Sequence, residues 1–239
     1  MTLKFRASIC TALVLASMQA DASSLQASPI SVTIDAAKGA TSLTLKNTGE
    51  APIQAQVRLV QWKQAGNSDV LEPTEEILAS PPFTTIPAHS TQLVRVVVAD
   101  ASLDVAERNY RVIVDELPET GAAIQKGITV NLRYSIPIRV VGAVEAARPS
   151  LVTRWSSSGK SVALTIQNDG NGRAQLSSVK ANVSGGEEVL LENGLLGYVL
   201  PGAARTWTFQ MPSDAAAKSI RSFTAVSNGA TVNLNRSPE

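Results

Sequence analysis

The sequence predicts an all-β protein made of two immunoglobulin-like β-sandwich domains. Short stretches of alternating apolar and polar residues recur along the chain, separated by Gly, Pro, Asn and Asp. Helical periodicity is weak, and the Ala-rich stretch 214–219 fits a loop as well as a helix. One pattern occurs twice at an offset of 121 residues, as SLTLKNTG at 42–49 and as ALTIQNDG at 163–170. Each copy is an alternating strand that runs into an Asn-x-Gly turn, which favours two similar domains.

The alternating stretches divide between the two halves of the chain. In the first half we expect strands near 30–34, 41–47, 53–62, 83–86, 91–98, 108–116 and 127–141. In the second half we expect strands near 151–155, 161–167, 174–183, 188–191, 204–210, 221–226 and 230–234. About seven short strands joined by frequent turns are typical of an immunoglobulin-like sandwich.

The N-terminal residues have the pattern of a secretory signal peptide. Lys4 and Arg6 precede the short apolar run 7–16, and Ala20-Asp21-Ala22 is a cleavage site of the A-x-A type. We therefore expect a signal peptide at 1–22 and domains at 23–143 and 144–239, joined by a short linker within 142–149. Because no later stretch is long and apolar enough to span a bilayer, we do not expect a membrane-embedded protein.

Cysteine content and charge exclude several classes of protein. The single cysteine, Cys10, lies in the predicted signal peptide, so the mature chain has no disulfide, thiolate metal ligand or cysteine nucleophile. The formal net charge is only +1, from 21 Lys and Arg against 20 Asp and Glu. This balance argues against nucleic acid or a strongly charged membrane surface as partner.

The residues that an enzyme would need are scarce. His89 is the only histidine, and it lies in a stretch typical of a surface turn before a strand. The carboxylate pairs at 75–76, 115–116 and 187–188 are adjacent in sequence, so on a strand the two members point to opposite faces. We interpret them as solvated charges. We therefore expect no enzyme, no catalytic residues, no cofactor and no metal site.

Residues 128–140 carry the strongest pattern in the chain. Apolar side chains alternate with mostly polar ones at Ile128, Val130, Leu132, Tyr134, Ile136, Ile138 and Val140. As one strand this segment would span about 43 Å. Pro137 has no N–H to donate, which indicates an edge or a bulge on at least one side. Because a long apolar edge strand promotes aggregation, its presence suggests that another chain pairs with it.

Arginines accompany the strands of the same predicted sheet. They are Arg95, Arg108, Arg111, Arg133 and Arg139. A guanidinium group suits the binding of a carboxylate because its donors are parallel. The same residues also fit ordinary solvent-facing positions or internal ion pairs, and the sequence leaves both interpretations open.

Several motifs give the chain a resemblance to a known family. The motifs are SPPF at 80–83, QLVRV at 92–96, RNYRV at 108–112, ELP at 116–118, the alternating segment and GYVLPG at 197–202. In order and spacing they resemble the periplasmic PapD-like pilus assembly chaperones, most closely the archaic members of the chaperone–usher pathway. The resemblance implies an L-shaped pair of immunoglobulin-like domains, a periplasmic location, and pilus subunits and an outer-membrane usher as partners.

The resemblance also implies roles for individual residues. Such chaperones lend a strand to an incomplete pilin, and the matching positions are Ile128, Val130 and Leu132, with Tyr134 as a fourth. The surface proline that engages the usher corresponds to Pro52, with Ile53 beside it.

One feature of the family does not transfer. Its best-known members hold the C-terminal carboxylate of the subunit with an arginine and a lysine, whose places correspond to Ser31 and Pro137 here. We expect Arg111 to bind the carboxylate instead, helped by Arg133 or Arg139.

Two other functions are compatible with parts of the sequence. An immunoglobulin-like structural or adhesive module of a surface polymer would also be all-β, but two complete domains and a short polar start at 23–28 favour the chaperone. A carbohydrate-acting enzyme would rest on fold analogy alone. The sequence does not decide which pilin or usher is involved, or whether the free protein associates with itself.

Overall fold

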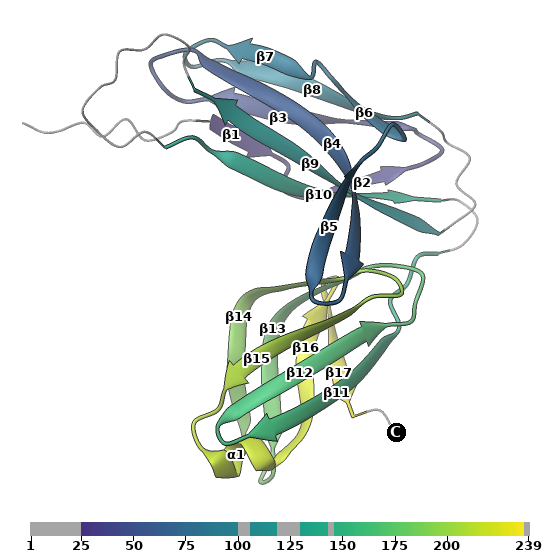
Figure 1. The fold of residues 1–239 in the computed structure, drawn as a ribbon, viewed down its shortest axis with the longest axis vertical. Helices are drawn as coiled ribbons and strands as arrows, with labels where there is room; N and C mark the ends of the chain where they lie inside the picture. Colours follow the sequence, from purple (N-terminus) through teal and green to yellow (C-terminus); the bar gives the residue numbers. More distant parts are fainter. Residues whose placement is uncertain (1–24, 100–105, 119–129, 143–145, 237–239) are drawn as a thin grey trace, which may run out of the picture.

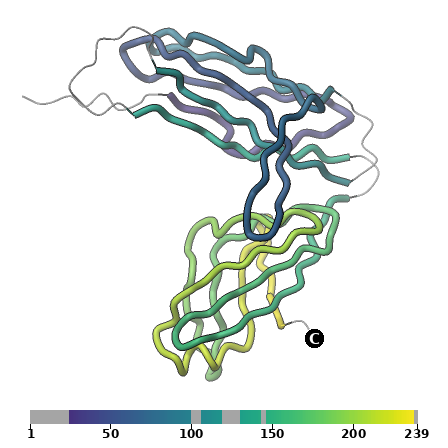
Figure 2. The backbone as a smooth tube through the Cα atoms, in the orientation of Figure 1, coloured from purple at the N-terminus to yellow at the C-terminus, as the bar shows by residue number. Residues whose placement is uncertain are grey.

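The computed structural model describes residues 25–99, 106–118, 130–142 and 146–236 (Figure 1). These residues form 17 strands and one short helix, arranged as two β-sandwiches that meet at an angle (Figures 1 and 2). The predicted all-β fold with two sandwich domains in an L shape is confirmed. The one helix among the described residues is far too short to cross a bilayer.

The first sandwich contains two sheets. One sheet has the strand order β1-β3-β8-β6. Its strands are β1 (Leu25–Ser28), β3 (Ala40–Asn47), β8 (Thr91–Val98) and β6 (Ile77–Ser80). The other sheet has the order β2-β10-β9-β4-β5, and β7 also pairs with β4. Its strands are β2 (Val32–Asp35), β10 (Arg133–Val141), β9 (Glu107–Leu117), β4 (Ile53–Ala65), β5 (Ser68–Pro73) and β7 (Phe83–Ile86).

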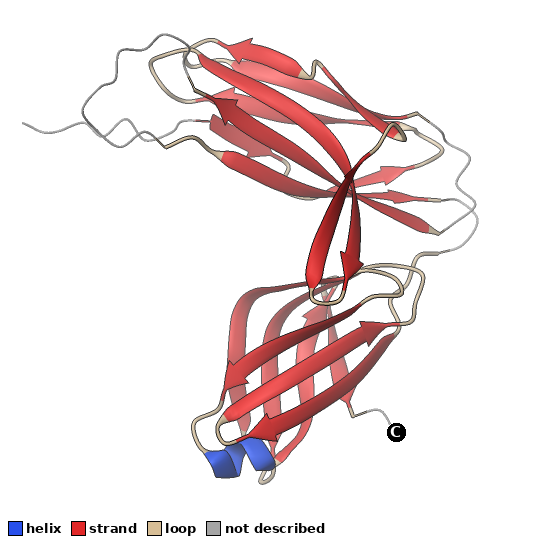
Figure 3. Ribbon diagram, in the orientation of Figure 1, coloured by secondary structure: helices blue, strands red, loops and turns tan. Residues whose placement is uncertain are grey.

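The second sandwich also contains two sheets, with orders β11-β12-β15 and β14-β13-β16-β17. The strands are β11 (Leu151–Ser158), β12 (Ser161–Asn168), β13 (Ala174–Val183), β14 (Glu188–Val199), β15 (Ala204–Gln210), β16 (Ile220–Ser227) and β17 (Ala230–Asn235). The helix α1 (Asp214–Lys218) lies at the far end of this sandwich (Figure 3). Ser213 starts the helix because its side chain accepts a hydrogen bond from the Ala216 N–H.

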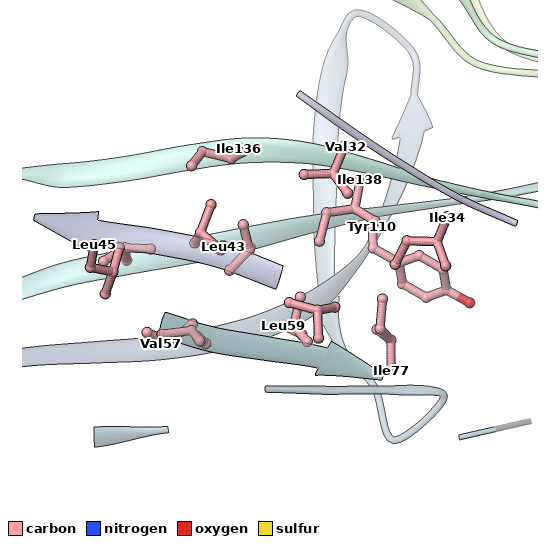
Figure 4. Packing of buried hydrophobic residues seen from close by; sticks show 14 of the residues in the cluster. Val32, Ile34, Leu43, Leu45, Val57, Leu59, Ile77, Tyr110, Ile136 and Ile138 are labelled. Carbon is pink, nitrogen blue, oxygen red and sulfur yellow. The ribbon is translucent and has the colours of Figure 1, made fainter. Parts of the chain in front are cut away.

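The apolar side chains of the alternating strands fill both cores, because every second side chain of a strand points to the same face. In the first sandwich, Leu43 and Leu45 of β3 face Val57 and Leu59 of β4 across the core (Figure 4). The last part of β10 supplies three more buried side chains, Ile136, Ile138 and Val140. A separate cluster around Leu164, Leu176 and Phe223 fills the second sandwich.

The two copies of the repeated pattern place a buried asparagine at equivalent positions. The Asn47 Oδ1 accepts from the Gly49 N–H, and its Nδ2 donates to the carbonyls of Ala51, Ile86 and Pro87. In the second sandwich, the Asn168 Oδ1 accepts from Gly170 and Ser150, and its Nδ2 donates to Gly172 and Val199. Both side chains satisfy backbone groups of a turn and tie that turn to a neighbouring segment.

The chain enters the second sandwich along the turn that follows Asn168. The Gly172 N–H donates to the Arg148 carbonyl at 3.0 Å. A Cβ at Gly170 would lie 2.3 Å from that carbonyl oxygen, and one at Gly172 would lie 2.6 Å from the Ala147 carbonyl carbon. Glycine is therefore required at both positions for the backbones to approach this closely.

Several strands differ from the predicted ones. The structure adds β1, β5 and β6, which are four to six residues long and carry too few alternations to be recognised. The strand expected at 188–191 extends to Val199 in β14. The strand expected from 127 to 141 begins at Arg133, since residues 130–132 adopt no strand and 119–129 lie outside the described part of the chain.

Candidate functional site

Strand β10 is paired unequally on its two sides. On one side it pairs with antiparallel β9 along its whole length, from Arg133 to Val141. On the other side, the parallel strand β2 covers only the part from Ile138 to Val141. Among the described residues, 133–137 therefore have no strand partner on this side, and we call this stretch the open edge.

Pro137 stands where the open edge ends. The Leu132 carbonyl accepts from the Glu116 N–H at 2.9 Å, so even-numbered residues of the segment direct their main-chain groups toward β9. Arg133, Ser135 and Pro137 direct theirs to the other side. The missing N–H of Pro137 thus faces the edge, as the sequence predicted, and Arg133 and Ser135 supply the N–H groups available there.

The four predicted donor residues differ in exposure. Val130 is 54% exposed, and Leu132 is half-buried. Tyr134 is also half-buried, and its hydroxyl donates to the Leu25 carbonyl of β1 at 2.6 Å. Ile128 lies outside the described residues. Tyr134 thus packs against the core of its own domain, Leu132 lies at the margin of the domain, and Val130 is exposed.

Arg111 lies on the outer face of this sheet and is largely covered. Its guanidinium lies 3.8 Å from the ring centroid of Trp62 and 5.7 Å from that of Tyr198 in the second domain. One nitrogen donates to the Ser135 carbonyl at 3.2 Å, and another lies 3.6 Å from Asp69. Only 14% of the side chain is exposed, and this burial lowers the pKa of Arg111 below its ordinary value.

The position of Arg111 relates directly to the anchor implied by the family resemblance. Val32 of β2 aligns with Ile138, so Ser31 and Pro137 adjoin the point where the two strands begin to pair. Arg111 is the residue opposite Pro137 on β9. Arg111 therefore lies one strand away from Pro137 and two strands away from Ser31.

The two proposed helper arginines share the outer face with Arg111 but have carboxylate partners of their own. Arg133 binds Asp115, which also accepts from Arg58 at 2.6 Å. Arg139 lies 3.5 Å from Glu107, whose side chain is fully buried. The expectation that the carboxylate pair 115–116 is solvated is wrong for Asp115, because only 11% of its side chain is exposed. Two arginines compensate its burial.

The predicted usher-contact pair divides between surface and core. Pro52 is exposed, directly before β4. Ile53 is 7% exposed and packs in the first core, so it supports the surface from beneath and does not form part of it.

His89 lies in an exposed turn, as expected, and its Nε2 is 3.1 Å from Glu50. Its backbone has a positive φ of 54°, which fits a turn. Within the described ranges, no group of three or more His, Cys, Asp or Glu side chains could hold a metal ion.

No local sequence pattern identifies the residues that join the two domains. The hairpin of β4 and β5 reaches from the first sandwich to the second (Figure 1). In this hairpin, Gln64 donates to the Tyr198 carbonyl and accepts from the Leu200 N–H. Asn67 donates to the Thr206 carbonyl and accepts from its N–H. Tyr198 and Leu200 lie in the GYVLPG motif, which in the sequence indicates a family resemblance but no contact between the domains.

Aromatic and charged groups complete the junction. The rings of Trp62 and Tyr198 meet edge to face with centroids 5.3 Å apart. Asp69 accepts from Arg205 of the second domain at 2.8 Å. The Arg173 guanidinium lies 5.0 Å from the Tyr198 ring, and its burial lowers the pKa of Arg173.

Comparison with known proteins agrees with this architecture. Residues 24–140 match the family described as pili and flagellar-assembly chaperone, PapD N-terminal domain. The chain belongs to the PapD-like chaperone family. No curated protein matches it in a sequence comparison.

Several solved structures resemble this PapD-like chaperone over both of its domains. A chain of the CsuC–CsuE chaperone–tip adhesion subunit pre-assembly complex, from archaic chaperone-usher Csu pili of Acinetobacter baumannii, has 24% identity and a TM-score of 0.70. The alignment covers 90% of this chain and 99% of that one. The YadV chaperone has 18% identity and a TM-score of 0.61, with 89% and 99% covered. A chain of the Salmonella enterica SafA pilin–SafB chaperone complex has 17% identity and a TM-score of 0.60, with 90% and 98% covered.

Proposed function

We propose that this PapD-like chaperone captures pilus subunits in the periplasm by donating residues 128–134 as a strand, and delivers them to an outer-membrane usher. The observation that carries the proposal is the one-sided pairing of β10, which leaves main-chain groups of 133–137 without a strand partner. A subunit strand can add there through main-chain hydrogen bonds, as in other strand-addition complexes. The resemblance to a structure from an archaic system supports an archaic pathway.

The side chains that precede the open edge would supply the apolar contacts. Val130 and Leu132 continue the sequence alternation beyond the chaperone's own core, and in an extended donor strand Ile128 would be the next residue on their face. Burying each of them in a subunit groove contributes about 1.5–3 kcal/mol before the entropy of association is subtracted. Tyr134 supports the edge from inside, because its hydroxyl already binds Leu25.

We assign Arg111 as the residue that binds the C-terminal carboxylate of the subunit. Its position opposite Pro137, beside the open edge, supports the assignment. The subunit carboxylate would compete for Arg111 with Asp69, whose carboxylate lies 3.6 Å from the Arg111 guanidinium. Asp69 would keep Arg205 as its other partner. Because Arg133 and Arg139 have partners of their own, a helper role for either requires that it leave Asp115 or Glu107.

The remaining assignments follow from surface position and sheet membership. We assign Pro52 as the usher contact, because it is exposed while Ile53 is not. We propose domain limits of 23–143 and 144–239, since strands up to Val141 share one sandwich and strands from Leu151 share the other. A signal peptide at 1–22 would direct the chain to the periplasm.

Substitution at Leu132 tests strand donation. Leu132→Arg puts a charge where the subunit groove is apolar, so the chaperone should no longer co-purify with its co-expressed pilus subunit. Leu190→Arg is the matched control, because Leu190 is 54% exposed in the second domain, away from β10. Circular dichroism of both variants checks that they fold. Undiminished capture by Leu132→Arg would refute donation at this site.

A further inference from the structure

The alternating pattern of the predicted donor segment does not fix its register. A slip of β10 by two residues along β9 keeps every apolar side chain on the same face. Apart from Tyr134, the apolar residues from 128 to 140 are aliphatic and similar in size, so their burial alone distinguishes such slips weakly. Something else must therefore hold the segment in one register, and the position of Val130 and Leu132 relative to the domain depends on it.

A single cross-strand pair of opposite charge lies at the start of β10. Arg133 is directly opposite Asp115 on β9, and its Nε binds that carboxylate. Arg58 on β4 donates to the other oxygen of Asp115 at 2.6 Å. Burial acts to raise the pKa of Asp115, but the hydrogen bonds and charges of Arg58 and Arg133 outweigh it and lower that pKa. The carboxylate is thus buried, charged and paired with both arginines.

The two alternative registers are unfavourable for different reasons. A slip in one direction would bring Arg139 opposite Arg111 and Ser135 opposite Asp115. Like charges directly across strands repel, and Asp115 would lose its partner. A slip in the other direction would bring Asn131 opposite Asp115. Arg139 would then face Glu107, which it already contacts at 3.5 Å, so little is gained and the buried Asp115 still loses a cation.

Glu116 strengthens the same register from the next position. Its N–H donates to the Leu132 carbonyl at 2.9 Å, and its Oε2 accepts from the Leu132 N–H at 3.1 Å. Both main-chain groups of Leu132 are therefore held by one residue. These bonds hold the chain two residues after Val130, at the point where the segment joins the domain.

We propose that Asp115 is a positioning residue that sets the register of the donor segment. The inference rests on the proposed function in one respect: for strand donation, the register places Val130 and Leu132 at a fixed distance from the open edge. Asp115 acts through Arg133 and does not touch the subunit.

Nuclear magnetic resonance of the isolated chaperone tests the proposal without any subunit. Arg133 and Asp115 form a non-hydrogen-bonded pair, whose Hα atoms lie close together in the native register. In Asp115→Ala we expect this Hα–Hα contact to weaken, and the Glu116 amide, which binds the Leu132 carbonyl, to exchange at least tenfold faster. Amides between β4 and β9 should keep their exchange rates, which separates a local loss of register from general destabilisation.

Two further variants keep the result interpretable. Arg133→Ala removes the same pair from a side chain that is 68% exposed, so it leaves the core intact and should reproduce the faster exchange. Lys180→Ala removes an exposed ion pair with Glu188 in the second domain. It should change neither the Hα–Hα contact nor the exchange rate of the Glu116 amide. An unchanged Hα–Hα contact and unchanged Glu116 exchange in both Asp115→Ala and Arg133→Ala would overturn the register assignment.

Subunit capture then separates this inference from the proposed function. If Asp115→Ala alters the exchange while Leu132→Arg still captures the subunit, the register assignment holds and strand donation fails. If the exchange is unaltered while Leu132→Arg loses capture, strand donation holds and the register assignment fails.

Discussion

Asn67 of the first domain pairs with Thr206 of the second through both ends of its side-chain amide. Its Nδ2 donates to the Thr206 carbonyl at 3.0 Å, and its Oδ1 accepts from the Thr206 N–H at 2.8 Å. Gln64 makes an equivalent pair with the Tyr198 carbonyl and the Leu200 N–H, at 3.0 and 2.9 Å. The hairpin thus binds main-chain atoms of the second domain at two separate points, which fixes an angle and not merely a distance.

Loss of these amides should loosen the angle between the domains. In the double variant Gln64→Ala with Asn67→Ala, four hydrogen bonds between the domains are lost, each of which contributes about 0.5–1.5 kcal/mol. We expect each sandwich to stay folded while small-angle X-ray scattering shows a larger radius of gyration. Lys63→Ala is the control, since Lys63 pairs with Glu72 inside the hairpin. An identical scattering curve for the double variant would contradict the role of the hairpin.

Arg111 should matter more for subunit capture than its neighbour Arg108. Arg111 lies opposite Pro137 beside the open edge, whereas Arg108 lies 3.5 Å from Glu76. A hydrogen bond to a charged group is worth about 1.5–3 kcal/mol, which corresponds to roughly ten- to hundredfold weaker binding in Arg111→Ala. Binding of the purified subunit measures the effect.

A retained fold must be shown for that comparison, because Arg111 also stacks on Trp62. Arg111→Lys keeps the charge and loses the planar contact, so its affinity should lie between those of the wild type and Arg111→Ala. Equal losses of affinity in Arg111→Ala and Arg108→Ala would remove the anchor assignment.

Asp115 should make the first domain sensitive to acid. Its pKa is lowered in the folded protein because Arg58 and Arg133 outweigh the effect of burial. A lowered carboxyl pKa contributes stability above the unfolded value of about 4, and this contribution is lost as the pH falls through the folded pKa. In Asp115→Asn the free energy of unfolding should therefore drop at pH 7, and the difference from wild type should shrink toward pH 3.

Urea unfolding at the two pH values measures this difference. Glu188→Gln serves for comparison, since Glu188 pairs with Lys180 at an exposed site and should show almost no difference at either pH. A gap between Asp115→Asn and wild type that stays constant from pH 7 to pH 3 would exclude an ionised Asp115 as its source.

Gly172 should tolerate no side chain. A Cβ there would lie 2.6 Å from both the Ala147 carbonyl carbon and the Arg148 nitrogen, which are backbone atoms that must shift. We expect Gly172→Ala to destabilise the second sandwich by about 1–3 kcal/mol or more, seen as a lower thermal unfolding midpoint. Gly194→Ala, whose nearest neighbour would be the Glu192 side chain at 3.5 Å, should unfold near the wild-type temperature. Equal midpoints for the two variants would show that the backbone can yield.

Local patterns predicted a large part of this protein. Alternation of period two identified the all-β class and most strands, because it reflects which face of a strand is buried. The repeated Asn-x-Gly turn identified two similar domains, and the structure shows why, since Asn47 and Asn168 bind the backbone in equivalent ways. The arginines near β9 and β10 were also recognised as a group.

Only the tertiary structure determines which of those residues are exposed and which already have partners within the protein. Alternation predicts the face of a side chain but not its neighbours, so it could not show that β2 covers β10 only from Ile138. It could not show that Arg133 and Arg139 already have carboxylate partners, or that Ile53 is buried beneath Pro52. Nor could it reveal that Gln64 and Asn67 bind the second domain, because contacts across more than 130 residues leave no local pattern. The sequence by itself determines the side-chain chemistry and the local spacing. The exposure of each side chain and its hydrogen-bond and ion-pair partners depend on which distant segments fold against each other.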